Sequence, residues 1–279
     1  MRGLAEYAMS GRRQAVTVAV LFGLIPMLNI LSAAIVGLVV LRKGLQEGLL
    51  VLLWALLPAG LQWVISDTTP VIMLFGVTAL AMLLRSSGSW SKVLVAATVL
   101  GLLTQLSLAL QVDYVATVEA FFTELLADNQ GLASANGTAA TPEDLVALLM
   151  QFYGAYHILL FVVCLIIARA WQASLYNPGG FRQEFHALRL DPRMVGLLLV
   201  LALAGMYGIE PLSDWVALLC MAPMFVGLAI IHCVVALRQW GAGVLVIGYL
   251  TLMLMSPAVI ALGFADSVFN FRKRAGNQE

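Results

Sequence analysis

Long apolar stretches separated by short polar segments dominate the chain. Eight stretches compete for the role of membrane-spanning helix, and none of them contains a lysine or an arginine. They cover residues 15–41, 45–65, 70–84, 93–110, 145–168, 194–207, 215–237 and 244–264. A bilayer core about 30 Å thick needs roughly 20 residues of helix. The pattern therefore predicts an all-α, polytopic transmembrane helical bundle of about eight segments, with residues 1–279 in one integral membrane domain.

Prolines interrupt the first and the last of these stretches. Pro26 lies three residues before Asn29 in the first, and Pro257 lies inside the last. Proline removes a backbone hydrogen bond and kinks or breaks a helix. Both stretches are flanked by positive charge on either side, so a helix that breaks and returns to the same face places both basic clusters together. We expect this return at Pro26, and the same arrangement is open at Pro257.

Composition and charge narrow the class of protein. Hydrophobic residues make up 62% of the chain and charged residues only 11%, with a net charge of +0 and a mean hydropathy of +0.96. These values exclude a water-soluble globular protein, a disordered chain and a basic nucleic-acid binder. Basic and acidic connections alternate along the central stretches, and basic connections face the cytoplasm. We therefore expect a bacterial inner-membrane protein with the basic segment 169–193 in the cytoplasm and the loop 111–144 outside.

One part of the basic segment is amphipathic. Phe181, Phe185 and Leu188 share a helical face opposite Arg182 and Arg189. Such a helix lies along the membrane surface, here on the anionic cytoplasmic leaflet. It either packs against the rim of the bundle or binds a partner.

Few residues are candidates for chemistry. No hydrolase elbow, Walker loop, HExxH motif or paired Cys/His constellation occurs, so no catalytic residue, metal site or cofactor is predicted. The most polar patch inside a stretch contains Tyr153, Tyr156 and His157, which the three- and four-residue spacing places on one helical face. These side chains either hydrogen-bond a ligand or relay a proton, or they form an interhelical hydrogen-bond cluster. Asn29 joins the candidate substrate-binding residues because a broken helix exposes backbone groups that transporters use for ligands. Gln62 lies near a membrane interface, where solvation explains it.

The last stretch is followed by a polar motif of unknown role. Asp266 and Asn270 are four residues apart, and Arg272 begins a basic cluster directly after them. The motif is either a basic stop with a surface ion pair, or a partly buried carboxylate that holds the final helix or binds a partner.

Two parts of the chain resemble a known family. They are Gly263-Phe-Ala-Asp266 with Asn270-Phe-Arg272-Lys273, and Pro26 with Leu41-Arg42-Lys43-Gly44 and Gly48. Together they resemble the YybS-like family of bacterial predicted membrane proteins, a domain of unknown function. The first half is also similar in pattern to S-components of energy-coupling-factor transporters, which have a broken opening segment, a glycine-containing turn and a hydrophobic span. No vitamin-binding residues carry over from that similarity.

Two function classes follow. The first is a transport-type substrate-binding membrane component that resembles an S-component, with its site at Asn29, Tyr153, Tyr156 and His157. The alternative is a non-catalytic membrane scaffold or assembly factor for envelope or cytoplasmic partners. An enzyme is not expected. The expected partners are membrane lipids, a small-molecule or lipid-like substrate and a protein at the cytoplasmic face, but no nucleic acid.

Overall fold

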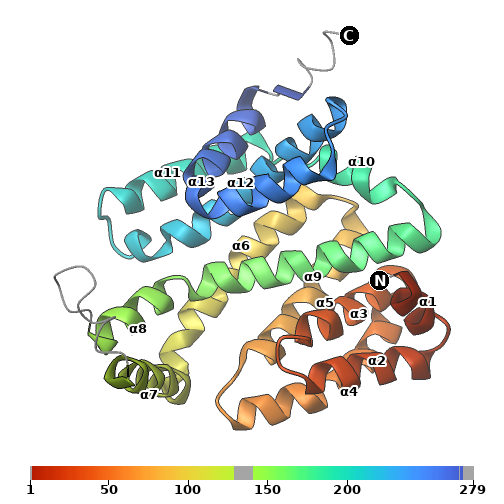
Figure 1. Ribbon diagram of the computed structural model, residues 1–279, viewed down its shortest axis with the longest axis horizontal. Coiled ribbons are helices and arrows are strands. Elements are labelled where there is room, and N and C mark those ends of the chain that lie inside the picture. The colour runs from red at the N-terminus through yellow and green to blue at the C-terminus, as the bar shows by residue number, and fades with distance from the viewer. Residues whose placement is uncertain (1, 129–140, 270, 273–279) are drawn as a thin grey trace.

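The computed structural model describes residues 2–128, 141–269 and 271–272, apart from the side chains of residues 242 and 250–255. Within these residues every regular element is a helix (Figure 1). The elements in chain order are α1 (Arg2–Met9), α2 (Arg12–Leu24), α3 (Asn29–Lys43), α4 (Leu45–Val64), α5 (Thr69–Ser87), α6 (Trp90–Ser107), the short 3-10 helix η1 (Leu108–Leu110), α7 (Val112–Asp128), α8 (Pro142–Gln151), α9 (Tyr153–Tyr176), α10 (Gly180–His186), α11 (Pro192–Met206), α12 (Leu212–Leu237) and α13 (Ala242–Phe269).

Among the residues that the structure describes, five segments are long and apolar enough to cross a membrane: α4, α5, α6 together with η1, α9 and α12. The expectation of eight spans is not confirmed. The stretch 15–41 forms two helices of 13 and 15 residues, and α11 has 15 residues, or about 22 Å of helix. These helices are too short to span a bilayer core alone. The chain is nevertheless a multi-pass, integral membrane protein by the length and composition of the five longer segments.

The outer face of α4 is apolar and exposed, as expected for a surface in contact with lipid. Leu49, Leu53, Leu57 and Leu61 recur every fourth residue, and each is between 46% and 64% exposed. Residues four apart lie on one face of a helix, so these side chains form a continuous apolar stripe. Such a stripe is unfavourable in water and favourable in contact with lipid tails.

The predicted break near Pro26 is confirmed. Helix α2 ends at Leu24 and α3 begins at Asn29, with Met27 between them at a φ of 67°. Arg12, at the start of α2, forms a 2.6 Å ion pair with Glu47, which follows the end of α3. Helices α2 and α3 therefore form a hairpin that returns the chain to the face from which it started.

The corresponding prediction of a break at Pro257 is wrong. Pro257 lies inside α13, as Pro58 lies inside α4 and Pro223 inside α12. A proline removes only one of the many backbone hydrogen bonds in a long helix, and the turns on either side continue it. At Pro26 the helix ends because Ile25, the residue before the proline, is extended, and Met27 beyond it is left-handed.

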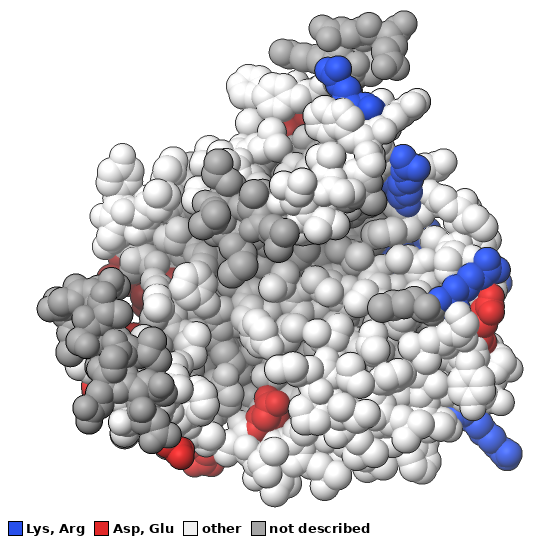
Figure 2. Space-filling model, in the orientation of Figure 1, with Lys and Arg blue, Asp and Glu red and all other residues white. Residues whose placement is uncertain are grey.

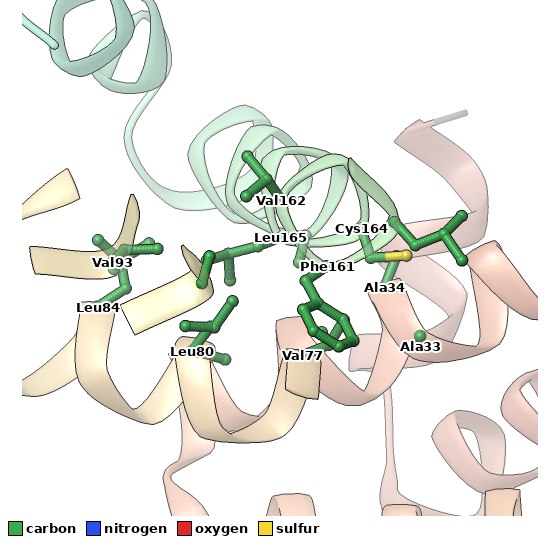
Figure 3. Packing of buried hydrophobic residues seen from close by; sticks show 14 of the residues in the cluster. Ala33, Ala34, Val77, Leu80, Leu84, Val93, Phe161, Val162, Cys164 and Leu165 are labelled. Atoms are coloured by element: carbon green, nitrogen blue, oxygen red, sulfur yellow. The ribbon is translucent and has the colours of Figure 1, made fainter. Parts of the chain in front are cut away.

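Helix α9 crosses the middle of the molecule and is the centre of its core (Figure 1). Phe161 and Leu165 of α9 point toward Val77 and Leu80 of α5, as Figure 3 shows, and all four are at most 1% exposed. The ring of Phe161 occupies the space that a β-carbon on Gly76 would need, so the glycine allows close packing here.

Charge is divided between the two ends of the bundle. The visible Lys and Arg side chains lie on the right of the view in Figure 2, and most visible Asp and Glu lie to the left and along the bottom. We call the end with the start of α2, the α3–α4 and α5–α6 connections and the end of α9 the basic end. The acidic end is opposite, at the α2–α3 break, the α4–α5 connection and the start of α9. At the basic end, Glu47 and Glu184 are both paired with arginines, Arg12 and Arg169.

Candidate ligand-binding site

The break between α2 and α3 opens onto a pocket of about 370 Å³ at the acidic end of the bundle. Met27 and Asn29 line one side of the pocket, and Gln62, Asp67 and Tyr156 contribute from α4, the α4–α5 connection and α9. The volume lies within the usual range for small-molecule sites. The pocket is thus built from four helices, α3, α4, α5 and α9, together with the α2–α3 break and the α4–α5 connection.

Asn29 and Gln62 form a chain of hydrogen bonds beside the break between α2 and α3. The Asn29 Nδ2 donates to Gln62 Oε1 at 3.0 Å, and Gln62 Nε2 donates to the carbonyl of Gly23 at 2.7 Å. This carbonyl is in the last turn of α2, where no further helical N–H is available. Gln62 therefore caps α2 and orients the Asn29 amide. The Asn29 Oδ1 is buried and has no partner among the described residues.

Asp67 adds negative charge to the same pocket. Its backbone N–H donates to the carbonyl of Gln62 at 3.0 Å, and its Oδ1 accepts the backbone N–H of Thr69 at 3.0 Å. These contacts fix the carboxylate at the start of α5. The pocket thus contains the amide oxygen of Asn29 and the carboxylate of Asp67, which only accept hydrogen bonds, and the hydroxyl of Tyr156. A complementary ligand carries N–H or O–H donors.

Tyr153 lies in a separate hydrogen-bond cluster and does not line the pocket. Its hydroxyl donates to Gln111 Oε1 at 3.1 Å and lies 3.2 Å from the hydroxyl of Thr68, which also donates to Gln111. The Gln111 Nε2 in turn donates to Ser107 at 2.9 Å. Tyr114 stacks against Tyr153 with ring centroids 5.5 Å apart, and burial, with a smaller effect of Tyr153 itself, raises the pKa of Tyr114 to about 12. This cluster links the α4–α5 connection, the η1–α7 connection and the start of α9 at the acidic end, so its role is structural.

His157 is fully buried, and its ring is tilted against Tyr153 and edge-on to Tyr156. Its ring centroid is 4.4 Å from that of Tyr153 and 5.5 Å from that of Tyr156. The Nδ1 lies 2.9 Å from the Tyr153 carbonyl, and a carbonyl only accepts, so Nδ1 carries the proton. The Nε2 of the neutral ring is then an acceptor, and it is buried without a partner among the described residues. His157 lies behind Tyr156 and supports its ring from the core.

The four predicted substrate-binding residues therefore separate into two pairs. Asn29 and Tyr156 line the pocket, whereas Tyr153 and His157 are buried beside it. The expectation that Tyr153, Tyr156 and His157 share one helical face is wrong for Tyr156, which is 48% exposed while the other two are buried. Successive residues of a helix point about 100° apart, so Tyr156 and His157 face different directions.

Two residues of the pocket were missed in the sequence. The position of Gln62 near a membrane interface is explained by solvation from the sequence alone, and the sequence does not distinguish Asp67 from other acidic residues in the connections. The local signal that fits Gln62 is its place in the last turn of a predicted helix, with no charged residue directly beside it. Asp67 had the Asp-x-Thr spacing of a helix-capping residue, which indicates its position but not the pocket.

The C-terminal motif forms a second polar cluster, at the basic end. Asp266 is 0% exposed, and its Oδ2 accepts from Arg272 Nη2 at 2.7 Å and from Arg272 Nε at 3.1 Å. Arg272 also donates to the carbonyls of His186 and Leu188, and Arg189 donates to the carbonyl of Asp266 at 3.1 Å. The carboxylate is therefore buried and joins the end of α13 to the α10–α11 connection, instead of forming a surface ion pair. Asn270 lies outside the described residues.

Among the described residues, no three His, Cys, Asp or Glu side chains lie close enough to hold a metal ion. Comparison of the chain with protein-family models, with curated proteins and with solved structures finds no match. The argument about function therefore depends on the pocket and on the two polar clusters.

Proposed function

We propose that this protein is an inner-membrane component of a bacterial transport system, and that it binds a small molecule in the pocket at the acidic end. The observation that carries the proposal is the Asn29 side chain. The broken helix holds its amide beside a 370 Å³ pocket, and its Oδ1 is buried without a partner. A buried oxygen without a hydrogen bond costs about 1–3 kcal/mol, so its retention beside a cavity fits a group that a ligand satisfies.

The ligand is a neutral or cationic molecule with several hydrogen-bond donors. This class follows from the acceptors of Asn29 and Asp67 and from the aromatic face of Tyr156, on which a cation or a planar ring packs. The positive-inside rule places the acidic end outside the cell, so the site receives its ligand from the exterior. The resemblance to S-components agrees with such a site, and the resemblance to the YybS-like family agrees with a bacterial membrane protein.

The test is thermal unfolding of the purified protein with panels of small molecules. Amines, nucleosides and polyols supply donors, and dicarboxylates of similar size serve as the contrasting panel. A ligand at one hundred times its dissociation constant stabilises the folded state by about 2.7 kcal/mol. We expect stabilisation by members of the donor panels only, and stabilisation by the dicarboxylates alone would contradict the proposal.

Variants then locate the site. Asn29→Leu and Tyr156→Phe should remove or reduce the shift that the ligand produces in the wild-type protein. Tyr207→Phe is the matched control, because Tyr207 is exposed and does not line the pocket. An equal ligand-induced shift in all three variants would place the ligand elsewhere.

The alternative is a membrane scaffold, and the C-terminal motif favours it. Phe269 and Phe271 lie near the buried Asp266 cluster, and both are exposed. A scaffold should co-purify with partner proteins and show no stabilisation with any panel, whereas a transport component should bind a small molecule and co-purify with an ATPase.

A further inference from the structure

A second cavity lies on the side of the bundle near the basic end. It has a volume of about 490 Å³ and is bounded by α9, α10, α12 and the Tyr249 side chain of α13. Its apolar wall extends over two turns of α9, from Leu159 to Ile167, and over two turns of α12, from Met224 to His232. Two helical turns rise about 11 Å along the helix axis, so the groove has the length of part of an acyl chain.

The end of the groove at α10 is positively charged. Arg182 and His186 line it, and none of its described lining residues is an aspartate or a glutamate. Glu184, the acid nearest in sequence, is engaged by Arg169 and by the indole N–H of Trp90. Arg182 itself has no ion pair or hydrogen bond to any residue that the structure describes.

His186 shows the effect of this environment. Burial, and to a smaller extent the neighbouring Arg182, His232 and Arg272, lower the pKa of His186. His186 is therefore a neutral imidazole near pH 7, so Arg182 supplies the positive charge at this end of the groove and His186 supplies an N–H donor to an anion.

The groove opens toward lipid rather than toward water. Leu159 is 38% exposed on α9, which is long and apolar enough to cross a membrane, and Tyr249 of α13 is 47% exposed. Phe181 and Phe185 of α10 close the groove at the basic end, and Phe185 lies 5.3 Å from the ring of His232. An occupant therefore enters sideways from the bilayer, with its charged group at α10 and its apolar part between α9 and α12.

We propose that this groove binds one anionic phospholipid, whose phosphate is held by Arg182 and His186 and whose acyl chain packs between α9 and α12. This site is separate from the acidic-end pocket and does not depend on the function proposed for it. The charge complementarity of α10 selects a lipid with net negative charge, because a zwitterionic headgroup would place its own cation beside Arg182.

The first test is native mass spectrometry of the full chain, released from detergent and titrated with phosphatidylglycerol or with phosphatidylcholine of the same acyl chains. We expect one tightly retained phosphatidylglycerol and at least five-fold weaker retention of phosphatidylcholine. Arg182→Gln should weaken retention of phosphatidylglycerol about five-fold, which corresponds to one arginine near a membrane surface. Arg193→Gln is the matched control, since Arg193 is exposed on the same basic segment but does not line the groove.

The second test fills the groove. Val163→Trp should displace the lipid, whereas Val200→Trp, at an exposed position on α11 outside the groove, should not. Equal retention of the two lipids by the wild-type protein would overturn the proposal. Equal loss in the Arg182→Gln and Arg193→Gln variants would also overturn it, because the charge would then act through general attraction and not at this site.

Discussion

The buried carboxylate of Asp266 leads to the most quantitative prediction. Arg272 makes two hydrogen bonds to Asp266 and two to the carbonyls of His186 and Leu188, and its side chain is only 9% exposed. Removing one partner of a buried ion pair costs about 3–5 kcal/mol, because the other charge remains buried. Arg272 keeps two carbonyl acceptors when Asp266 is neutralised, so we expect Asp266→Asn to cost about 3 kcal/mol.

Arg272→Lys should cost less, about 2 kcal/mol. A lysine ammonium reaches the carboxylate as a point charge, but it does not present the planar fork that also reaches two carbonyls on the α10–α11 connection. In the double variant the pair is broken only once, so its cost should be smaller than the sum of the two single costs.

The assay is reversible unfolding in mixed micelles, combined with quantification of each variant in the membrane fraction. Insertion should be unchanged, because the motif follows the spans. Asp191→Asn is the matched control: Asp191 caps α11 by accepting the Arg193 N–H at 2.9 Å, and asparagine caps a helix equally well. A cost below about 1 kcal/mol for Asp266→Asn, or additive costs in the double variant, would refute the buried pair.

Three further predictions follow from other parts of the structure. Single cysteines should be labelled from outside the cell at Tyr207 and only after permeabilisation at Gln183, and the reverse pattern would invert the orientation. His157→Leu should change the free energy of unfolding by no more than about 1 kcal/mol, because the lost hydrogen bond from Nδ1 is offset by removal of the unpartnered Nε2. A loss in the free energy of unfolding clearly above about 1 kcal/mol would contradict this. The pKa of His186 is lowered, so the folded state resists its protonation, and stability should fall as the pH drops below about 6.5, the ordinary histidine value. His186→Gln should reduce this slope, and an unchanged slope between pH 6.5 and 5 would assign it to other groups.

The parts of the fold that the sequence predicted are those that local chemistry decides. Thr141-Pro142 indicates a helix start, and Thr141 indeed caps α8 reciprocally with Asp144, whose pKa is lowered by hydrogen bonds from the backbone and side chain of Thr141. The chain breaks near Pro26 as expected. The return of α3 to the side from which α2 starts was also predicted, because positive charge on both flanks of a broken helix constrains where its two ends lie.

The number of spans and the partners of polar residues were not predictable in this way. Composition does not distinguish a helix of 15 residues that packs against its neighbours, such as α11, from a span with the same apolar content. Gln62 and Asn29 are 33 residues apart, and only the packing of the α2–α3 hairpin against α4 brings their amides together. Asp266 reaches the α10–α11 connection by a contact of the same long-range kind, over 77 residues to Arg189.

Two amides in the membrane show how a structural role differs from a binding role. Gln105 uses both of its polar atoms within the fold, because its Oε1 accepts the Gly154 N–H at 2.7 Å and its Nε2 donates to the Met150 carbonyl at 2.9 Å. These bonds satisfy the backbone at the junction of α8 and α9, so the residue is fully accounted for by the helix ends that it joins. Asn29 uses its donor in the same manner, but its acceptor remains buried and unpaired beside a cavity. The sequence places both residues in apolar stretches and favours Asn29 only because it lies beside the helix break at Pro26. The difference in hydrogen-bond satisfaction assigns Gln105 to the fold and leaves Asn29 as the residue through which we propose that a ligand binds.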